Sequence, residues 1–361
     1  MKILVGMMHP KHVYIFKNFI YEMIKRGHEV EIAAIEKDIT ESLLKENGLQ
    51  YNLIGKNPDT PIKKFLNIPL WTFKTLKIAQ QFKPDIFIGQ AFPHFAYVSA
   101  FLNKPYVIFE DTESAQAVQV ITFPFASSIV TPSCYEKDLG KKHIRFDGYF
   151  ELAYLHPNYF TPDPSILKKM NLDLSDTYII IRFVSWQAIH DAGHSGLTLE
   201  TKREAIQTFE KYGKVFISSE KSLPKEFEKY CISTKGMHDL LFYATLLYGE
   251  SSTMASECAV LGTHAIYCDF TGRGYTNEEQ KKYNLVFNFK LDENSQKKSV
   301  YKAVDLLIDP QTKITGRQKQ HSLLEDKIDV TAFMVWFIEN YPSSVVAKKQ
   351  QLKISTDKTL F

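Results

Sequence analysis

The sequence lacks the features that mark several classes of protein. Its four cysteines show no CxxC spacing and predict neither a zinc site nor a disulfide framework. Lysine and arginine number 44 against 41 aspartate and glutamate, whereas a general nucleic-acid binder would need a basic face. We therefore expect neither a disulfide-rich secreted domain nor a nucleic-acid partner.

Long hydrophobic runs are also missing. Residues 1–5 are typical of a first strand, and no charge-free apolar core of signal length follows them. The longest uncharged run, residues 114–135, is too polar and too broken by proline for a spanning helix. The sequence therefore favours a cytoplasmic protein, with peripheral contact at the inner face of a membrane as an alternative.

The small excess of positive charge lies at the carboxyl end. Residues 343–361 contain four lysines and one aspartate, which equals the formal charge of +3 for the whole chain. This basic tail has no sustained apolar face, so we expect it to be disordered and solvated. The alternative is weak contact with an anionic membrane.

The first half alternates between strand-like and helix-like segments, at apolar and charged contents that are globular. A helical stretch at residues 62–82 contains Pro69, which predicts a break there. The expected strands cover residues 2–7, 29–35, 51–54, 85–89, 106–110 and 128–131.

After a segment rich in Pro, Tyr and Asp at residues 147–164, the alternation restarts. Strands are expected at residues 178–183, 214–217, 231–233, 246–248, 265–268 and 286–289. Repeated β-α units predict an α/β protein with two Rossmann-like domains that face a cleft. The expected divisions are residues 1–150, residues 165–329, an apolar helix at residues 330–342 that packs across the seam, and the tail.

The stretch from 246 to 268 contains a strand, a small-residue turn, a helix and a second strand. Backbone N–H groups and the helix dipole at such a turn attract an anion, most often phosphate. Glu257 lies one helical turn after Thr253, and its carboxylate could accept hydrogen bonds from the two hydroxyls of a ribose. The alternative is a plain strand–turn–helix with serine and threonine as caps. The candidate phosphate-binding residues are Gly249, Glu250, Ser251, Ser252 and Thr253.

In the first half, the loops that follow strands should carry the chemistry, because ligands bind at the carboxyl ends of strands in this architecture. Glu110, Asp111 and Glu113 follow one strand, and neighbouring carboxylates can raise a pKa to suit a general base. The alternative is that they cap the next helix. His12 and His94 follow two other strands, and a helix start would also explain the polar residues near His12.

A loop after residues 178–183 is unusually rich in polar and aromatic side chains. Two histidines with an aspartate between them could bind a metal, but Gly193 argues against the helix that their spacing requires. We expect no metal and predict hydrogen bonds to phosphate or sugar, with one histidine able to carry a proton. The alternative is backbone-bonded loop histidines. The candidate residues are Arg182, Trp186, Gln187, His190, Asp191 and His194.

Five segments in both halves resemble the uncharacterised prokaryotic family known as domain of unknown function 354. That family resembles the two-Rossmann glycosyltransferase-B (GT-B) superfamily, which includes the UDP-GlcNAc 2-epimerases and the MurG-type transferases. The segments are HPKHVYIFKN (9–18), FEDTE (109–113), SWQAIHDAGHSGLT (185–198), GESSTMASECAVLGTHAIY (249–267) and RGYTNEEQKKYNLVFNF (273–289).

The MurG-like pattern of a small-residue turn, Ser-Glu and Gly-x-x-Ala is similar to residues 251–252, 256–257 and 262–265. The resemblance implies diphosphate at Ser251 to Thr253 and ribose at Glu257.

The resemblance to the epimerases is less complete. They place a carboxylate where Glu110 or Glu113 falls and a histidine-containing loop near His190. Their aspartate after the strand at residues 85–89 is replaced here by Gln90 and His94, and a further glutamate soon after Glu110 is missing. These departures argue against epimerisation.

We therefore expect a metal-independent, nucleotide-sugar-dependent glycosyltransferase that acts in polysaccharide biosynthesis. It would use a UDP-sugar as co-substrate and no cofactor, with the nucleotide in the second domain and a glycan or lipid-linked sugar acceptor in the first. Arg182 and Arg273 would stabilise the diphosphate. The base candidates are Glu110, Glu113, His12, His94 and His190. The alternatives are a sugar-nucleotide epimerase and a nucleotide-sugar-binding protein without turnover, and a homodimer is left open.

Overall fold

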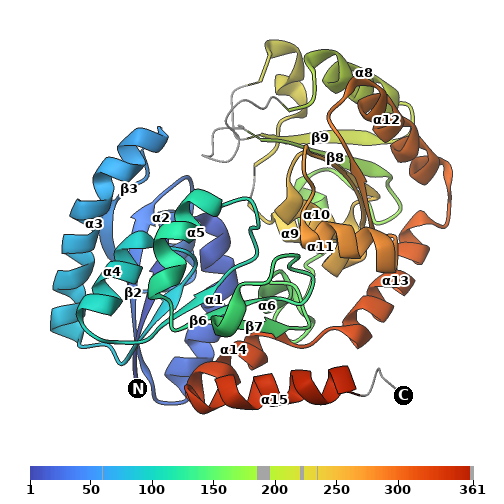
Figure 1. Ribbon diagram of the computed structural model, residues 1–361. Coiled ribbons are helices and arrows are strands. Elements are labelled where there is room, and N and C mark those ends of the chain that lie inside the picture. The colour runs from blue at the N-terminus through green and yellow to red at the C-terminus, as the bar shows by residue number, and fades with distance from the viewer. Residues whose placement is uncertain (59, 185–195, 220–222, 234, 358–361) are drawn as a thin grey trace. The chain divides into compact units, whose positions relative to one another are not determined.

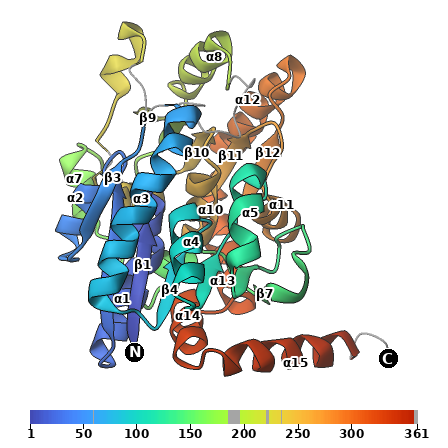
Figure 2. The ribbon, with the colours of Figure 1, turned by 60° about the vertical axis from the view of Figure 1, so that its left-hand side comes forward.

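The computed structural model describes residues 1–58, 60–184, 196–219, 223–233 and 235–357 (Figures 1 and 2). The chain divides into two compact units. Residues 1–154 form the first unit together with the chain from Ile328 onward, and residues 155–327 form the second. Each unit is built on one parallel sheet, which confirms the predicted α/β class with two Rossmann-like halves.

The sheet of the first unit has the order β3-β2-β1-β4-β5-β6-β7, and every pair is parallel. The central strands are continuous apolar runs, as expected when helices cover both faces. The strands are β1 (Lys2–Met7), β2 (Glu29–Glu36), β3 (Asn52–Lys56), β4 (Ile86–Gly89), β5 (Tyr106–Phe109), β6 (Ser128–Pro132) and β7 (His143–Phe146).

Strand order decides where the helices of the first unit lie. The chain moves from β1 to β3 in one direction and from β4 to β7 in the other, so right-handed crossovers place the helices on opposite faces. The helices α1 (Pro10–Lys25) and α2 (Thr40–Glu46) cover one face. The other face carries α3 (Pro61–Phe82), α4 (Pro93–Phe101) and α5 (Gln116–Thr122), as Figure 2 shows.

The sheet and helices of the first unit depart from the prediction at α3 and at β7. Helix α3 continues through Pro69, where a break was predicted. Proline leaves the carbonyl of residue 65 without its helical donor, and Phe65 is exposed, so solvent can satisfy that carbonyl. Strand β7 was not predicted at all, because four residues that alternate with a histidine and an arginine give little strand signal.

The chain returns to the first unit at its carboxyl end. Helix α14 (Val330–Glu339) packs against α1, and its Phe333 stacks on Phe146 of β7. The tail, expected to be disordered, instead begins as helix α15 (Ser343–Asp357). Its first turn is fixed because the buried Ser344 hydroxyl donates to the Phe337 carbonyl oxygen at 2.6 Å.

The sheet of the second unit has the order β12-β11-β10-β8-β9 and is also parallel. The strands are β8 (Tyr178–Phe183), β9 (Lys214–Ser219), β10 (Leu246–Gly249), β11 (His264–Cys268) and β12 (Val286–Phe289). The strand expected at residues 231–233 is reduced to a single bridge between Ile217 and Cys231.

Helices cover both faces of this second sheet. Helices α8 (Leu199–Phe209) and α12 (Glu293–Ile308) share one apolar core with it. Helices α9 (Met237–Tyr243), α10 (Ser252–Leu261) and α13 (Thr312–Asp326) pack against one another, and α11 (Gly274–Glu278) adjoins α10. Two short helices, α6 (Leu152–Leu155) and α7 (Ser165–Lys169), lie on the connection between the units.

Each sheet has one point at which the strand order reverses. In the first unit it lies between β1 and β4, and in the second unit between β8 and β10. Ligands of open α/β sheets bind outside the carboxyl ends of the strands at this point. Separately, no helix among the described residues is long and apolar enough to cross a membrane.

Candidate functional site

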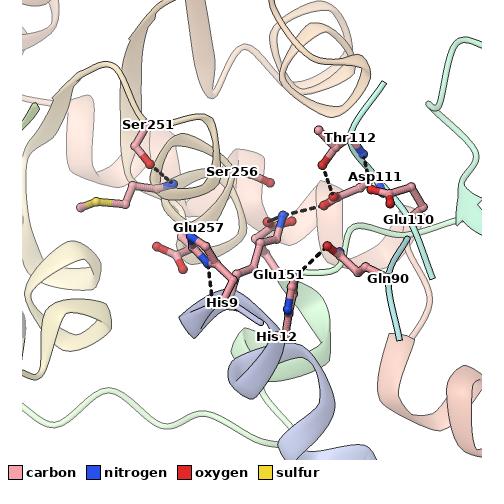
Figure 3. Close-up of polar contacts among 12 residues, drawn as sticks. His9, His12, Gln90, Glu110, Asp111, Thr112, Glu151, Ser251, Ser256 and Glu257 are labelled. Atoms are coloured by element: carbon pink, nitrogen blue, oxygen red, sulfur yellow. Dashed lines mark hydrogen bonds and ion pairs between the residues drawn. The ribbon is translucent and has the colours of Figure 1, made fainter. Parts of the chain in front are cut away.

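In the first unit, His12 bridges the two strands that flank the reversal point. It lies in the first turn of α1, and its Nδ1 accepts from the Met8 backbone N–H at 3.0 Å. The ring proton therefore sits on Nε2, which donates to Gln90 Oε1 at 2.8 Å (Figure 3). Burial lowers the pKa of His12 to about 3. Both ring nitrogens are engaged and the ring is neutral, so its geometry is that of a structural bridge.

Glu110 ties the loop after β5 to the loop after β4. Its Oε1 accepts from the backbone N–H groups of Asp111 and Thr112 at 3.1 and 3.0 Å, and its Oε2 accepts from Ala91 at 3.4 Å. The residue is only 3% exposed. Burial, together with the neighbouring charge of Asp111, raises the pKa of Glu110 to about 7, against the lowering effect of the three donors. Glu110 can therefore change protonation near neutral pH.

A buried ion-pair cluster lies beside Glu110. Lys11 Nζ is 2.5 Å from Asp111 Oδ2 and 3.2 Å from Glu151 Oε1. The two carboxylate side chains are 3% and 1% exposed, and that of Lys11 is 13% exposed. The Thr112 hydroxyl donates to the other Asp111 oxygen at 3.1 Å. Lys11 thus offsets the negative charge of two buried carboxylates.

The remaining acidic candidate, Glu113, lies in a different environment. Its Oε2 is buried and has no hydrogen-bond partner among the described residues. Burial raises the pKa of Glu113, and the charge of Asp111 adds to the shift. Glu113 therefore has one carboxylate oxygen that is protected from water and accepts no hydrogen bond from the described residues.

His94, the other histidine proposed as a base, lies in the core. Its ring is fully buried against Phe92, Phe95 and Trp71, and neither nitrogen has a hydrogen-bond partner within the described part of the chain. Burial lowers the pKa of His94 to about 3. The residue is therefore a neutral packing element in this structure.

In the second unit, the turn after β10 lies at the reversal point. Gly249 has φ 152°, and a Cβ there would lie 2.1 Å from the backbone oxygen of Arg182 on β8. Only glycine therefore allows this close approach. Ser251 caps α10, since its side chain accepts from the Met254 N–H at 3.3 Å (Figure 3). The N–H groups of Ser252 and Thr253 come first in the helix, where no intrahelical acceptor exists.

Glu250 has a role that the sequence did not indicate. Its carboxylate accepts from the backbone N–H of Val184 at 3.0 Å and from that of Leu197 at 2.5 Å. The ammonium of Lys202 lies 3.8 Å away, and the Glu250 side chain is fully buried. The expected contact of this side chain with phosphate is therefore not supported by the geometry. Glu250 instead fixes the two chain segments that flank residues 185–195.

Glu257 lies on the second turn of α10, as expected, and has a histidine partner. His238 Nε2 donates to Glu257 Oε1 at 3.0 Å (Figure 3 shows Glu257). His238 comes from α9, and its ring contacts Phe160 edge-on. The bond orients a carboxylate that is 5% exposed. A carboxylate has about four acceptor positions, and the bond from His238 occupies one of them.

The two arginines expected to meet a diphosphate have protein partners. The Arg182 guanidinium donates to Ser218 Oγ on β9 at 2.8 Å. The Arg273 guanidinium pairs with Asp269, the residue after β11, at 3.0 Å and also donates to Thr271. Both belong to the second unit, but each is held by side chains next to its own strand. Each guanidinium is therefore already bound by side chains of the second unit.

Several expected residues lie outside the described part of the chain. They are Trp186, Gln187, His190, Asp191 and His194. Among the described residues, no group of three or more His, Cys, Asp or Glu side chains is arranged to hold a metal ion.

Sequence reasoning also missed two residues of these clusters. Glu151 lies in the Pro-, Tyr- and Asp-rich segment 147–164, where it is one acid among aromatic residues. His238 lies on the short helix α9, just before β10, and nothing in the sequence singled it out. The sequence alone could not show that Glu151 contacts Lys11 or that His238 contacts Glu257, because only the folded chain brings these residues together.

Solved structures of similar fold include a glycosyltransferase and a protein in complex with UDP. The S. aureus MnaA structure with UDP has a TM-score of 0.66 at 11% identity, with 95% of this chain and 97% of that chain covered. A Listeria monocytogenes protein provisionally assigned as a UDP-N-acetylglucosamine 2-epimerase has a TM-score of 0.65 at 10% identity, with 94% and 96% covered. The spinosyn rhamnosyltransferase SpnG with its aglycone has a TM-score of 0.61 at 14% identity, with 94% and 100% covered. At these identities the likeness shows a shared fold, that of GT-B glycosyltransferases and epimerases.

Sequence comparison reaches a narrower group. A protein of Methanocaldococcus jannaschii described as uncharacterized is 22% identical over 275 residues, which is 73% of this chain and 80% of that protein. The model of the protein family of unknown function DUF354 matches residues 1–336. Because that match spans most of the chain, the protein belongs to the DUF354 family, as its sequence motifs predicted.

Proposed function

We propose that the protein is a nucleotide-sugar-dependent glycosyltransferase that needs no metal. The observation that carries the proposal is the turn from Gly249 to the first residues of α10. It lies at the reversal point of the second sheet, its glycine permits close approach to β8, and its helix presents N–H donors. Such a helix end binds a diphosphate through backbone donors and the helix dipole.

The nucleotide would lie along α10. In this proposal the N–H groups of Ser252 and Thr253 donate to the diphosphate, and Glu257 accepts from the ribose hydroxyls. His238 holds the Glu257 carboxylate in place for that contact. The same donors would stabilise the charge that grows on the diphosphate as it leaves the sugar. A UDP-sugar is the donor we favour, with a glycan or lipid-linked sugar as acceptor.

The first unit would bind the acceptor and provide the base. Glu113 is the residue we assign to deprotonate the acceptor hydroxyl, because it has a buried oxygen without a partner among the described residues and a raised pKa. Glu110 and His12 would act as positioning residues, since their hydrogen bonds hold the loops after β4 and β5. Lys11 would limit the repulsion between the acids of this cluster.

A substitution in the backbone tests the nucleotide site directly. Ser252→Pro removes one N–H at the first position of α10, where proline is well tolerated, and Ser251 already has the extended backbone that precedes proline. Ser252→Ala is the matched control, because it removes the hydroxyl and keeps the N–H. Calorimetry with UDP should show a loss of affinity of about ten- to a hundredfold for proline only. Equal affinity for all three proteins would refute the site.

An epimerase is the second candidate, and one observation favours it. Glu151 joins Glu110, Asp111 and Glu113, so the acidic cluster is richer than the sequence indicated. Carboxylates of this kind could move a proton at the sugar ring. UDP-GlcNAc incubated in D₂O without acceptor distinguishes the two reactions. Deuterium in the recovered sugar nucleotide would support the epimerase, whereas sugar transfer to an added acceptor would support the transferase.

A further inference from the structure

Helix α3 has a row of large apolar side chains that faces solvent. Ile62, Phe65, Leu66 and Phe73 are 74%, 66%, 70% and 67% exposed, and Leu70 is 48% exposed. Their spacing of three, four and seven residues places them on one face of the helix. Exposed apolar residues are ordinary when they are scattered, but a contiguous row marks a surface that something covers.

The opposite face of α3 already serves the core. Trp71, Ala79 and Phe82 are buried in the cluster that packs on the sheet of the first unit. The exposed row is therefore a second apolar face, which the fold of the unit does not require. Helix α3 itself lies beside α4 on this face of the sheet (Figure 2).

The charges of α3 all have one sign. The helix carries Lys63, Lys64, Lys74 and Lys77 and contains no aspartate or glutamate between residues 61 and 82. None of these lysines forms an ion pair with another residue of the described chain. Three of them lie beside the exposed row, because Lys74 and Lys77 follow Leu70 and Phe73 by one turn and Lys63 precedes Leu70 by two.

We propose that α3 docks the first unit on an anionic lipid bilayer. The helix lies in the plane of the membrane surface, with its apolar row among the upper acyl chains and its lysines at the phosphate groups. A second copy of the chain fits this surface less well. A two-fold interface through α3 would bring identical lysine rows together without any acid to offset them.

This surface is independent of the proposed nucleotide site, which lies in the other unit. The proposal of membrane docking can therefore be tested independently of the proposed nucleotide site. It also differs from the expectation that placed membrane contact in the basic tail. The lysines of the tail and those of α3 can be removed separately, which makes the two surfaces distinguishable.

Co-sedimentation of the full chain with vesicles tests the proposal. Vesicles of phosphatidylcholine with one third phosphatidylglycerol should bind the protein, and added salt should weaken the binding. Pure phosphatidylcholine should bind much less. Phe65→Ser with Phe73→Ser should lower affinity for the anionic vesicles at least about tenfold. Ile308→Ser with Ile314→Ser, two exposed apolar residues of the second unit, is the matched control and should bind as wild type does.

A second set of variants tests the charge. Lys63→Gln, Lys74→Gln and Lys77→Gln together should weaken vesicle binding about a hundredfold, at roughly fivefold per lysine. The matched control removes the same charge from the tail through substitutions of Lys348, Lys349 and Lys353 by glutamine. That control should leave binding to the anionic vesicles nearly unchanged.

Several outcomes would overturn the proposal. They are no binding to anionic vesicles, binding that the phenylalanine variant leaves intact, and equal losses from the α3 and tail lysines. A dimer in sedimentation equilibrium that the phenylalanine variant dissociates, without vesicle binding, would assign the row to a second copy. The substituted side chains are exposed, so thermal unfolding should match wild type. If the phenylalanine variant misfolds, the lysine variant tests the proposal alone.

Discussion

Lys11 makes the most demanding prediction about the first unit. It is the cation that lies within 3.2 Å of two buried carboxylates, Asp111 and Glu151. Lys11→Met keeps most of the side-chain volume and removes the charge. Two buried carboxylates then lose the ammonium that contacts both of them, and removing one partner from a buried ion pair costs about 3–5 kcal/mol. An exposed pair would cost less than about 1 kcal/mol.

The unfolding of the first unit can be followed by itself. The sequence has three tryptophans, and Trp71 and Trp336 belong to the first unit. In a Trp186→Phe background, urea unfolding followed by fluorescence reports only this unit, which matters because a chain of two units need not unfold in one step. Lys11→Met should lower its free energy of unfolding by about 3–5 kcal/mol.

A triple variant separates the loss of the ion-pair attraction from the cost of leaving buried carboxylates without their cation. Lys11→Met combined with Asp111→Asn and Glu151→Gln removes all three charges and keeps the side-chain shapes. Replacement of a whole buried ion cluster by neutral groups is often nearly neutral, so most of the lost stability should return. If the triple variant is no more stable than Lys11→Met, or if the single change costs less than about 1 kcal/mol, the burial argument is wrong.

Three further predictions concern single residues. The pKa of Glu110 is raised from 4.5 to about 7, so the folded state binds this proton more tightly. The associated stability, roughly 3 kcal/mol, is complete below pH 4.5 and is lost as pH rises through 7, and Glu110→Gln should remove that slope in urea unfolding. Gly249→Ala should abolish soluble expression or cost more than about 3 kcal/mol, because its Cβ would meet the Arg182 backbone. Gly140→Ala, at positive φ with open space, should cost only about 1 kcal/mol in the same assay. His94→Leu should raise stability by about 1 kcal/mol, since it removes a buried ring without hydrogen-bond partners among the described residues, and a loss in thermal unfolding would contradict this.

The sequence predicted most of the fold because buried parallel strands are short apolar runs between turn residues. Eleven of the twelve strands in the described part of the chain begin and end within about two residues of the expected bounds, because their apolar runs are clear, as in β1 and β8. β7 was missed because its four residues include His143 and Arg145. Pro69 misled the prediction of α3, because a helix tolerates proline where the carbonyl that loses its donor faces water.

The candidate site was harder to predict, because side chains choose partners that only the fold brings near. Glu110 and Glu113 lie together at a strand end, yet one is tied to three backbone N–H groups and the other keeps an oxygen without a partner in the described chain. Glu151 is 41 residues away from Glu110 in the sequence, and hydrophobic periodicity carries no information about such pairs. Glu250 lies in the turn that was expected to bind phosphate, but its carboxylate accepts from the backbone N–H groups of Val184 and Leu197.

The bonds of Glu250 have a consequence for how this family can diversify. A single carboxylate fastens Val184 and Leu197, so the sheet and α8 are secured at both ends of the intervening segment. Both bonds are made by backbone N–H groups, so they do not depend on the side chains at residues 184 and 197. Sequence variation between residues 184 and 197 would therefore leave both of these backbone anchors in place.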